Sequence, residues 1–369
     1  MEPEAWIPLS LLKPGGKCFF VGDHKQLGSV VRNSYAVTMG LEISIQERMW
    51  KMLESSQHSG QPTRCFALTK SYRAHPSILK LFNETVYGGV LQCYTKLSSV
   101  SQFLSSNSIT SKGLDGTVHP LRFHHVVGEE EKQQGSPSWQ NSEELRYVQY
   151  YVTQLILVHR VQRCDIGIIS PYRQQCTKIR QWLTSKGWSD ITVGTVENFQ
   201  GGERDVIVVS TVRSKRTDEL NRDMKFSIGF LGSFRRTNVA ISRAKALLIV
   251  IGNLKLLGQD NTWSGVLKIA ARMNAVWQGE PQHPTALTYQ EVQTLVPSMK
   301  AGEIAFSVNA ADGRIKVDTR YSASIAVVDD GVRHAQGAAG LGLGISAADP
   351  MLDDSIFLNS EAAWRDFDS

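Results

Sequence analysis

The sequence of 369 residues contains only five cysteines, and no two of them have CxxC spacing. This pattern argues against a disulfide framework and against a zinc site, and it indicates a reducing compartment. Long apolar runs are also missing, because the longest extends only from Ala246 to Ile251, far below the roughly 18 residues of a membrane span. The acidic N-terminus shows no apolar signal segment. We therefore expect a cytoplasmic protein that has no membrane partner.

The sequence also lacks the usual phosphate-binding loop, because the pattern GxxxxGK[ST] occurs nowhere in it. Gly15-Gly16-Lys17 is a superficial look-alike in which Cys18 follows the lysine. No catalytic triad or zinc signature is present, and the adjacent His124 and His125 would point to opposite faces of a strand. We therefore predict no metal site within this sequence.

The charge is distributed unevenly along a sequence whose net charge is +5. Residues 340–369 contain six acids and one base, so residues 1–339 carry a net charge of +10. A basic body is compatible with a polyanionic partner but does not prove one. Apolar residues make up 41% of the chain, which indicates that most of it is globular.

Continuous apolar strands alternate with helical segments in the middle of the chain, a pattern typical of a parallel sheet covered by helices on both faces. The predicted fold class is therefore α/β, and polar clusters at the carboxyl ends of strands are candidate ligand sites. The predicted strands are 17–23, 65–68, 166–169, 191–193, 206–210 and 246–251, and the predicted helices are 42–53, 76–82, 142–159, 173–182 and 237–245.

Four segments are specific when they are taken together: VGDHKQLG (21–28), SYRAHP (71–76), VGTVENFQGGERD (193–205) and RRTNVAISRAK (235–245). In this order and at these separations they resemble motifs III to VI of superfamily 1 helicases of the Up-frameshift-like branch. Within that branch the sequence is most similar to the RNA-silencing helicases of the Armitage and Moloney-leukaemia-virus-10 type. The resemblance covers about residues 1–275.

The resemblance implies two RecA-like domains, of which this sequence contains the C-terminal part. Residues 1–60 would be the end of a truncated first domain, residues 61–275 a nearly complete second domain, and residues 276–369 an appended, partly disordered tail. In the family, the phosphate lysine of motif I and the magnesium ligands of motif II precede a segment similar to Met-Glu-Pro-Glu. Met1 therefore resembles an internal residue of a longer protein, and the chain alone would be inactive.

The resemblance also assigns roles in the hydrolysis of ATP. Arg73 and Arg243 match the two arginines that contact the γ-phosphate, and a guanidinium suits bidentate phosphate contact. Gln26 matches the glutamine that senses the γ-phosphate and orients the attacking water. Arg73, Arg243 and Gln26 are thus the candidate catalytic residues.

The candidate nucleotide-binding residues come from the same four segments. Tyr72 resembles the residue that stacks on the nucleotide base, Glu203 matches the acid that contacts the ribose, and Gly202 precedes it. Asp23 would order the loop that carries the catalytic glutamine, although a role as a simple turn-forming residue is equally open.

The candidate RNA-binding residues follow the predicted strands. Ser170, Tyr172, Thr195 and Arg213 match positions at which the family tracks a single strand of RNA across the tops of the domains. A departure from the family pattern is Ser29, which stands where most relatives have proline and puts a local RNA contact in doubt.

The implied function is an ATP-dependent RNA helicase that moves 5′ to 3′ on single-stranded RNA, acts in RNA silencing or decay, and uses ATP and Mg²⁺. Silencing or decay ribonucleoproteins would be its partners, and cytoplasmic ribonucleoprotein granules its location. Two alternatives stay open, namely a DNA helicase of the same superfamily and a non-enzymatic RNA- or protein-binding module, the latter if Met1 is a true start.

Overall fold

The computed structural model describes residues 1–31, 33–56, 66–106, 108–132, 138–214 and 233–296, and two short strands at 306–308 and 315–317. The chain divides into two compact units, residues 1–299 and residues 300–369. In the second unit the described residues are the antiparallel pair β14 (Phe306–Val308) and β15 (Ile315–Val317). The remaining description concerns the first unit.

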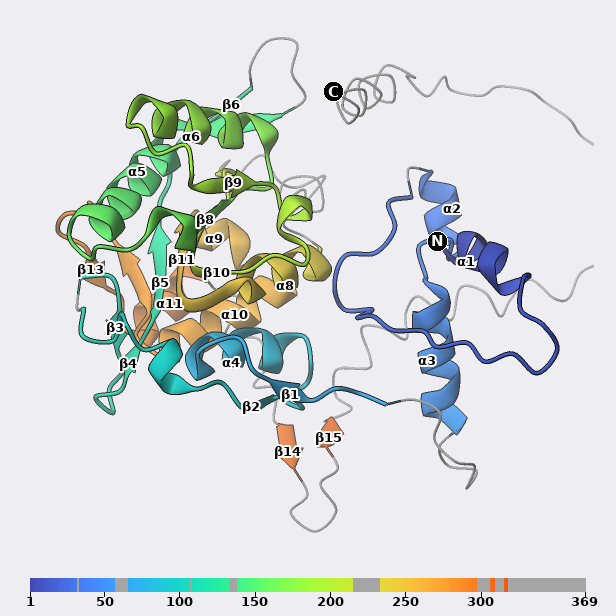
Figure 1. Ribbon diagram of the computed structural model, residues 1–369. Coiled ribbons are helices and arrows are strands. Elements are labelled where there is room, and N and C mark those ends of the chain that lie inside the picture. The colour runs from blue at the N-terminus through green and yellow to red at the C-terminus, as the bar shows by residue number, and fades with distance from the viewer. Residues whose placement is uncertain are drawn as a thin grey trace, which may run out of the picture. The chain divides into compact units, whose positions relative to one another are not determined.

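A seven-stranded sheet lies at the centre of the first unit (Figure 1), with the strand order β13-β12-β5-β11-β10-β8-β9. Its pairs are parallel except for the antiparallel pair β12–β13 at one edge. The strands are β5 (Leu121–His125), β8 (Ile166–Ile169), β9 (Thr192–Gly194), β10 (Arg204–Ser210), β11 (Ala244–Gly252), β12 (Val276–Gln278) and β13 (Thr285–Ala286). This sheet confirms the predicted α/β class.

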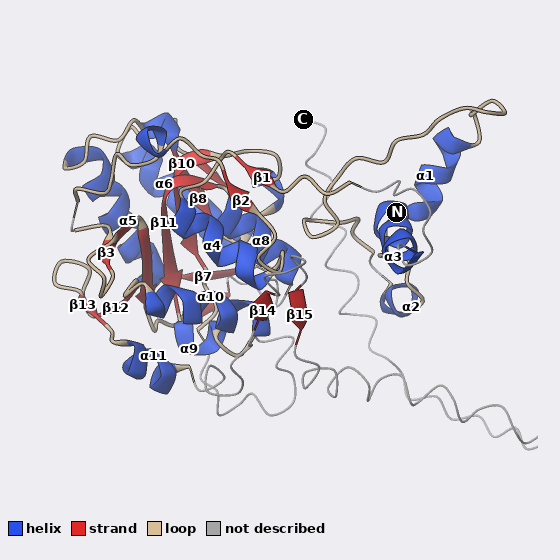
Figure 2. Cartoon of the chain, turned by 90° about the horizontal axis from the view of Figure 1, so that it is seen from below, coloured by secondary structure: helices blue, strands red, loops and turns tan. Residues whose placement is uncertain are grey.

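Helices cover both faces of the sheet (Figure 2), and side chains alternate between these faces along each strand. Ile207 and Val209 of β10 belong to one buried cluster, whereas Val206 and Val208 belong to the other. The first cluster includes α4 (Pro76–Thr85), α8 (Phe234–Ser242), α9 (Leu254–Leu257), α10 (Asn261–Arg272) and α11 (Tyr289–Leu295), and the second includes α5 (Ser142–Leu157) and α6 (Arg173–Ser185).

The helices begin where local capping chemistry allows. At α4, the His75 ring accepts a hydrogen bond from the Ser77 backbone N–H, and Pro76 occupies the first turn, where its missing N–H costs nothing. The cap of α5 is Asn141, whose side chain accepts from the Glu144 N–H, one residue before the position expected from the sequence. Capping therefore fixes the start of both helices.

Two features of the sheet region differ from the sequence-based expectation. Strand β5 was missed because its buried Arg122 and His124 hide the apolar pattern; Arg122 stacks on Trp277 at 3.9 Å, and His124 contacts the Tyr151 hydroxyl at 2.6 Å. The sheet also continues through β12 and β13, and residues up to Val296 pack into the first buried cluster, so no separate tail begins at 276. Strand β12 is held by pairing with β5, and β13 by pairing with β12, and no local pattern reveals these pairings.

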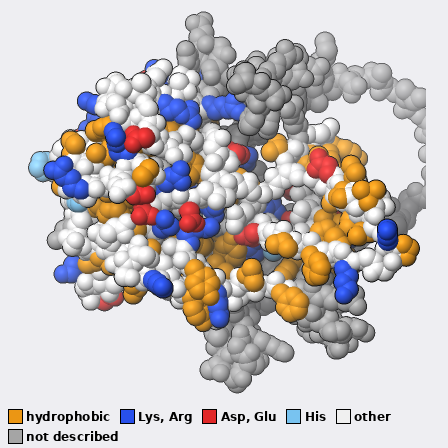
Figure 3. Space-filling view, in the orientation of Figure 1, with side chains coloured by type: hydrophobic (Ala, Val, Ile, Leu, Met, Phe, Trp, Pro, Cys, Tyr) orange, Lys and Arg blue, Asp and Glu red, His pale blue; other side chains and the backbone are white. Residues whose placement is uncertain are grey.

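The described residues among 1–56 form α1 (Glu2–Leu9), α2 (Ser34–Thr38) and α3 (Ile45–Ser56), but no strand. The predicted strands 17–23 and 65–68 are wrong, because residues 17–23 and 66–68 form no strand, and Phe19 and Phe66 are each 83% exposed. A strand needs a neighbour for its backbone hydrogen bonds, and none of the described strands lies beside these residues. Figure 3 shows the resulting apolar side chains on the surface of this region.

Three short strand pairs and three 3₁₀ turns complete the described structure. They are the parallel pair β1 (Lys70–Ser71) and β2 (Gln92–Cys93), the hairpins β3 (Ser111–Lys112) with β4 (Val118–His119) and β6 (Glu130–Lys132) with β7 (Trp139–Asn141), and the 3₁₀ turns 97–99, 163–165 and 197–199. Within the described residues, no helix has the length and apolar character needed to cross a membrane.

Candidate functional site

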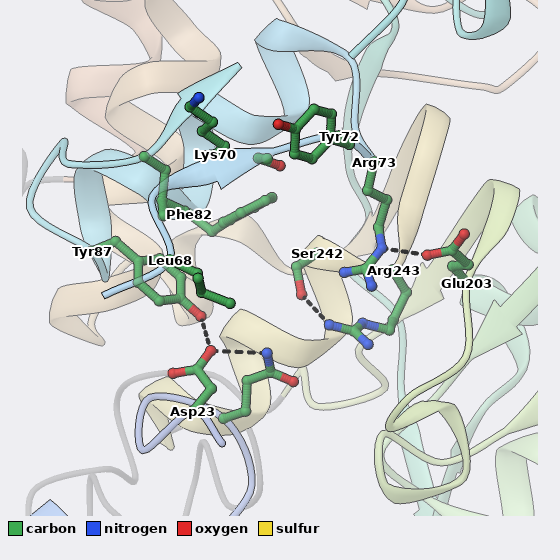
Figure 4. Close-up of a pocket in the computed structure, with 13 residues that line it drawn as sticks. Asp23, Leu68, Lys70, Tyr72, Arg73, Phe82, Tyr87, Glu203, Ser242 and Arg243 are labelled. Atoms are coloured by element: carbon green, nitrogen blue, oxygen red, sulfur yellow. Dashed lines mark hydrogen bonds and ion pairs between the residues drawn. The ribbon is translucent and has the colours of Figure 1, made fainter. Parts of the chain in front are cut away.

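A cavity of about 450 Å³ gathers six of the predicted site residues from four separate parts of the chain (Figure 4). The loop at residues 23–27, the end of β1, the approach to β10 and the end of α8 all contribute to its wall. The six predicted residues are Asp23, Gln26, Tyr72, Arg73, Glu203 and Arg243. Tertiary folding thus brings together residues that lie up to 220 positions apart in the sequence.

Arg243 is the most buried charged group of this cavity. It ends α8 immediately before β11 and is only 2% exposed. Its Nη2 donates to the Ser242 hydroxyl at 2.9 Å and its Nη1 to the Gly202 carbonyl at 3.4 Å, whereas its buried Nε has no hydrogen-bond partner. Burial, together with the charge of Arg73, lowers the pKa of Arg243 to about 10, so the guanidinium stays charged at neutral pH.

Arg73 lies beside Arg243 and forms an ion pair with Glu203. Arg73 follows β1, and Glu203 immediately precedes β10. Because both side chains of this pair are more than one third exposed, solvent screens their attraction, and an incoming anion can compete for the guanidinium. Two arginines facing one carboxylate leave an excess of positive charge, which suits a ligand with several anionic oxygens.

The loop at residues 23–27 is ordered by Asp23. One carboxylate oxygen accepts from the Lys25 backbone N–H at 2.9 Å. The other oxygen accepts from Gln26 Nε2 at 2.9 Å and from the Tyr87 hydroxyl at 2.5 Å. Asp23 therefore has the loop-ordering contacts that the sequence suggested, and it also reaches a tyrosine outside the four motifs.

Tyr72 presents an exposed aromatic ring at the cavity. Parallel pairing of Ser71 with Cys93 places Tyr72 beside Tyr94, and the two ring centroids are 5.7 Å apart with a 44° tilt. Tyr72 is 66% exposed, so its ring is accessible to a planar partner. Such a ring can stack on a nucleobase.

The four predicted RNA-binding residues lie where strands of the sheet end, whereas the cavity residues Glu203 and Arg243 lie where strands begin. Ser170 follows β8, Tyr172 caps α6, Thr195 follows β9 and Arg213 follows β10, so all four lie at the carboxyl ends of neighbouring parallel strands. The structure thus brings them together at the strand ends where the sequence predicted a ligand site. The nucleotide candidates Glu203 and Arg243 instead precede strands.

The surroundings of these four residues differ. Ser170 is fully buried, and its hydroxyl has no hydrogen-bond partner. Arg213 is 8% exposed, donates to Glu130 Oε2 at 3.0 Å and lies 5.0 Å above the Trp139 ring. The Nε of Arg213 is therefore already engaged by a protein carboxylate. The half-buried Thr195 donates its hydroxyl to Asn198 Oδ1 at 3.0 Å.

Comparison with known proteins identifies the family. A family model described as an AAA domain matches residues 41–255, more than half of the chain. The chain belongs to this family.

Among its relatives are two proteins named as RNA helicases. The chain is 36% identical to the human RNA helicase Mov10l1 over 291 residues, which cover 75% of this chain and 23% of that protein. It is 32% identical over 317 residues to the Drosophila melanogaster protein named "Probable RNA helicase armi", covering 81% and 26% of the two chains. Regulator of nonsense transcripts 1 of Dictyostelium discoideum is 30% identical over 339 residues, covering 88% and 23%. These relatives confirm the Up-frameshift-like superfamily 1 helicase family, and the chain spans about a quarter of their length.

The sequence analysis named six of the 13 residues that line the cavity and missed seven, of which five lie outside the motifs: Leu68, Lys70, Phe82, Tyr87 and Leu91. Tyr87 follows α4, and Lys70 belongs to β1; neither lies in a motif, and neither carries a signal in the sequence that would have identified it. Ser242 does lie in motif VI, where its place next to Arg243 was an available signal. The described residues contain no group of three or more His, Cys, Asp or Glu able to hold a metal ion.

Proposed function

We propose that the protein containing this chain is an ATP-dependent RNA helicase, and that the cavity binds the nucleotide. The observation that carries this proposal is the buried Arg243, whose Nε has no partner and whose neighbour is a second arginine. A buried, partnerless donor on a charged group is costly. An anionic oxygen of a phosphate would satisfy it, and the cavity volume lies within the range of small-ligand sites.

The proposed chemistry is attack by water on the γ-phosphorus, with cleavage of the bond to the oxygen that bridges the β- and γ-phosphorus atoms. Arg73 and Arg243 would hold the γ-phosphate and stabilise the negative charge that develops on its oxygens. Gln26 would accept a hydrogen bond from the attacking water. The products are ADP and inorganic phosphate.

The remaining cavity residues would position the nucleotide. Tyr72 would stack on the base, while Glu203 and the adjacent Gly202 would contact the ribose. Magnesium would accompany the phosphates, but no cluster in the described part of the chain fits it as a set of ligands. The contacts proposed for this chain are therefore those of its own side chains and backbone.

We further propose that single-stranded RNA crosses the edge formed by Ser170, Tyr172, Thr195 and Arg213, and that movement is 5′ to 3′. ATP would contact both the 23–27 loop and the arginines that follow β1 and α8, so nucleotide binding would favour closure and hydrolysis would release it. The names of the relatives support RNA as the substrate. A role in silencing or decay ribonucleoproteins and a cytoplasmic location belong to the same proposal.

The test is the RNA-stimulated ATPase of the native full-length protein that contains this chain. Replacement of Arg243 by alanine should lower kcat by about 10²–10³-fold, the typical loss for a group that stabilises transition-state charge. The control is Arg163→Ala, because Arg163 pairs with Asp190 on an exposed surface. Unchanged turnover in Arg243→Ala would refute the proposed role, and stronger stimulation by DNA of matched sequence would select the DNA helicase alternative.

A further inference from the structure

Tyr87 lines the cavity but lies outside the helicase motifs, and its hydroxyl both donates and accepts a hydrogen bond. The hydroxyl donates to Asp23 at 2.5 Å and accepts from Asn238 Nδ2 at 2.9 Å. Burial, followed by the contact with Asp23, strongly raises the pKa of this phenol. The hydroxyl therefore keeps its proton at neutral pH, and that single proton is directed at the carboxylate.

The carboxylate held by Tyr87 in turn determines how Gln26 is oriented. Asp23 Oδ2, the atom that accepts from the tyrosine, also accepts from Gln26 Nε2. The two ends of a glutamine amide have nearly the same shape, so hydrogen bonding decides which end faces which way. Since an ionised carboxylate can only accept, the amide nitrogen faces Asp23, and the carbonyl oxygen Oε1 is left for another donor.

Docking of the loop does not depend on the phenol alone. Lys25 Nζ donates to the Val86 carbonyl at 2.8 Å, and Asn238 Nδ2 donates to the Lys25 carbonyl at 2.9 Å. The Tyr87 ring also packs edge-on against Phe82, with the centroids 6.2 Å apart. Removal of the hydroxyl alone should therefore leave the ring packed and the loop in place, while Asp23 loses one of its two side-chain donors.

We propose that Tyr87 is a positioning residue for hydrolysis: by holding Asp23, it fixes the Gln26 amide with its carbonyl oxygen available to accept a hydrogen bond from the attacking water. This inference rests on the proposed ATPase function. It adds a tyrosine, supplied by the chain after α4, to the machinery that the four motifs define. It also explains why a carboxylate, rather than a residue that can both donate and accept, suits position 23.

The first experiment compares Tyr87→Phe with Tyr150→Phe in the ATPase assay of the native full-length protein. Tyr150 is a half-buried tyrosine of α5 that packs on Tyr151 and does not line the cavity. Tyr87→Phe should lower kcat by about three- to tenfold, the size expected when a residue that acts only through another group loses one hydrogen bond, with the KM for ATP changed less than about twofold. Tyr150→Phe should leave both constants unchanged.

A double-mutant cycle shows whether Tyr87 acts through Gln26. In a Gln26→Ala background, Tyr87→Phe should have no further effect on kcat, because the amide that it positions is gone. Additive losses would overturn the proposal, as would an unchanged kcat in Tyr87→Phe or a raised KM with an unchanged kcat.

Asp23→Asn serves as the second variant if Tyr87→Phe fails to fold. An amide at position 23 can both donate and accept, so it can form a hydrogen bond with either end of the Gln26 amide and no longer fixes its orientation. Its kcat should fall to a similar extent, and an unchanged kcat would overturn the proposal. If Arg243→Ala abolishes turnover while Tyr87→Phe and Asp23→Asn keep the wild-type kcat, only this inference fails. If Arg243→Ala is also normal, the ATPase proposal itself fails.

Discussion

Residues 1–56 and the sheet region at 66–296 contain similar apolar runs but use them differently. Phe19 and Val21 are 83% and 91% exposed, whereas Phe123 of β5 and Val208 of β10 are fully buried. The sheet region surrounds each strand with partners and helices on both faces, and the described residues provide no such partner for 17–21. Apolar sequence therefore becomes a strand only where neighbours complete its backbone hydrogen bonds.

Both regions also contribute side chains to the cavity. Residues 1–56 contribute Asp23 and Gln26 on a loop, whereas the arginines are held by the packed sheet region. The contacts between them include the Arg235–Glu47 ion pair at 2.9 Å and the packing of the partly buried Leu27 against the first buried cluster. Stability should therefore depend mainly on the sheet region, and the chemistry should depend on both.

The largest expected contrast is between two tryptophans. Trp263 of α10 is fully buried, whereas Trp6 of α1 is 54% exposed. Trp263→Ala should lower the free energy of unfolding by about 3–5 kcal/mol, because it leaves a cavity in the core. Trp6→Ala should change it by less than about 0.5 kcal/mol. Urea denaturation of both variants measures this contrast, and equal losses would contradict the division of stability.

A pH-dependent contrast of about 3 kcal/mol is expected for Glu144. Burial raises the pKa of its carboxyl from 4.5 to about 7, although it accepts hydrogen bonds from Ser210 and the Val212 N–H. Between those two pH values the native state keeps a proton that the unfolded state has lost, so the free energy of unfolding falls as pH rises. Glu144→Gln should abolish this part of the slope.

The measurement is urea denaturation of the wild type and Glu144→Gln from pH 4.5 to 8. Buried histidines such as His124 titrate in both proteins, so the difference between the curves isolates Glu144. Glu47 in the first region should behave oppositely: burial raises its pKa, but Lys51 and Arg235 outweigh this effect and lower it, so its contribution is lost as pH falls through the lowered pKa. Parallel curves for wild type and Glu144→Gln would refute the buried-carboxyl assignment.

The smallest expected contrast concerns two helix caps. Asp260 accepts from the Thr262 and Trp263 N–H groups at the start of the 12-residue α10. Asn33 accepts from the Ala36 N–H at the start of the five-residue α2. Asp260→Ala should cost about 1 kcal/mol because α10 is part of the core, and Asn33→Ala should cost clearly less. Thermal unfolding of both variants provides the comparison, and a larger loss for Asn33→Ala would contradict it.

Sequence reasoning succeeded where local pattern and local structure agree. The apolar runs predicted β8, β10 and β11 to within two residues at each end. The four motifs named six residues that meet in one cavity, although their roles stay predictions. The reasoning missed β5, whose polar side chains find buried partners, and β12, whose three residues are too few to show a pattern.

The sequence by itself determined the family, the parallel α/β class and which two arginines, Arg73 and Arg243, line the cavity. These depend on residue type and on spacing along the chain. Only the tertiary structure decided that Glu203 pairs with Arg73, that Arg213 is engaged by Glu130 and that Tyr87 reaches Asp23. Each of these contacts joins residues at least 64 positions apart. Such pairings arise from how the strands and helices pack, which no local pattern of residues specifies.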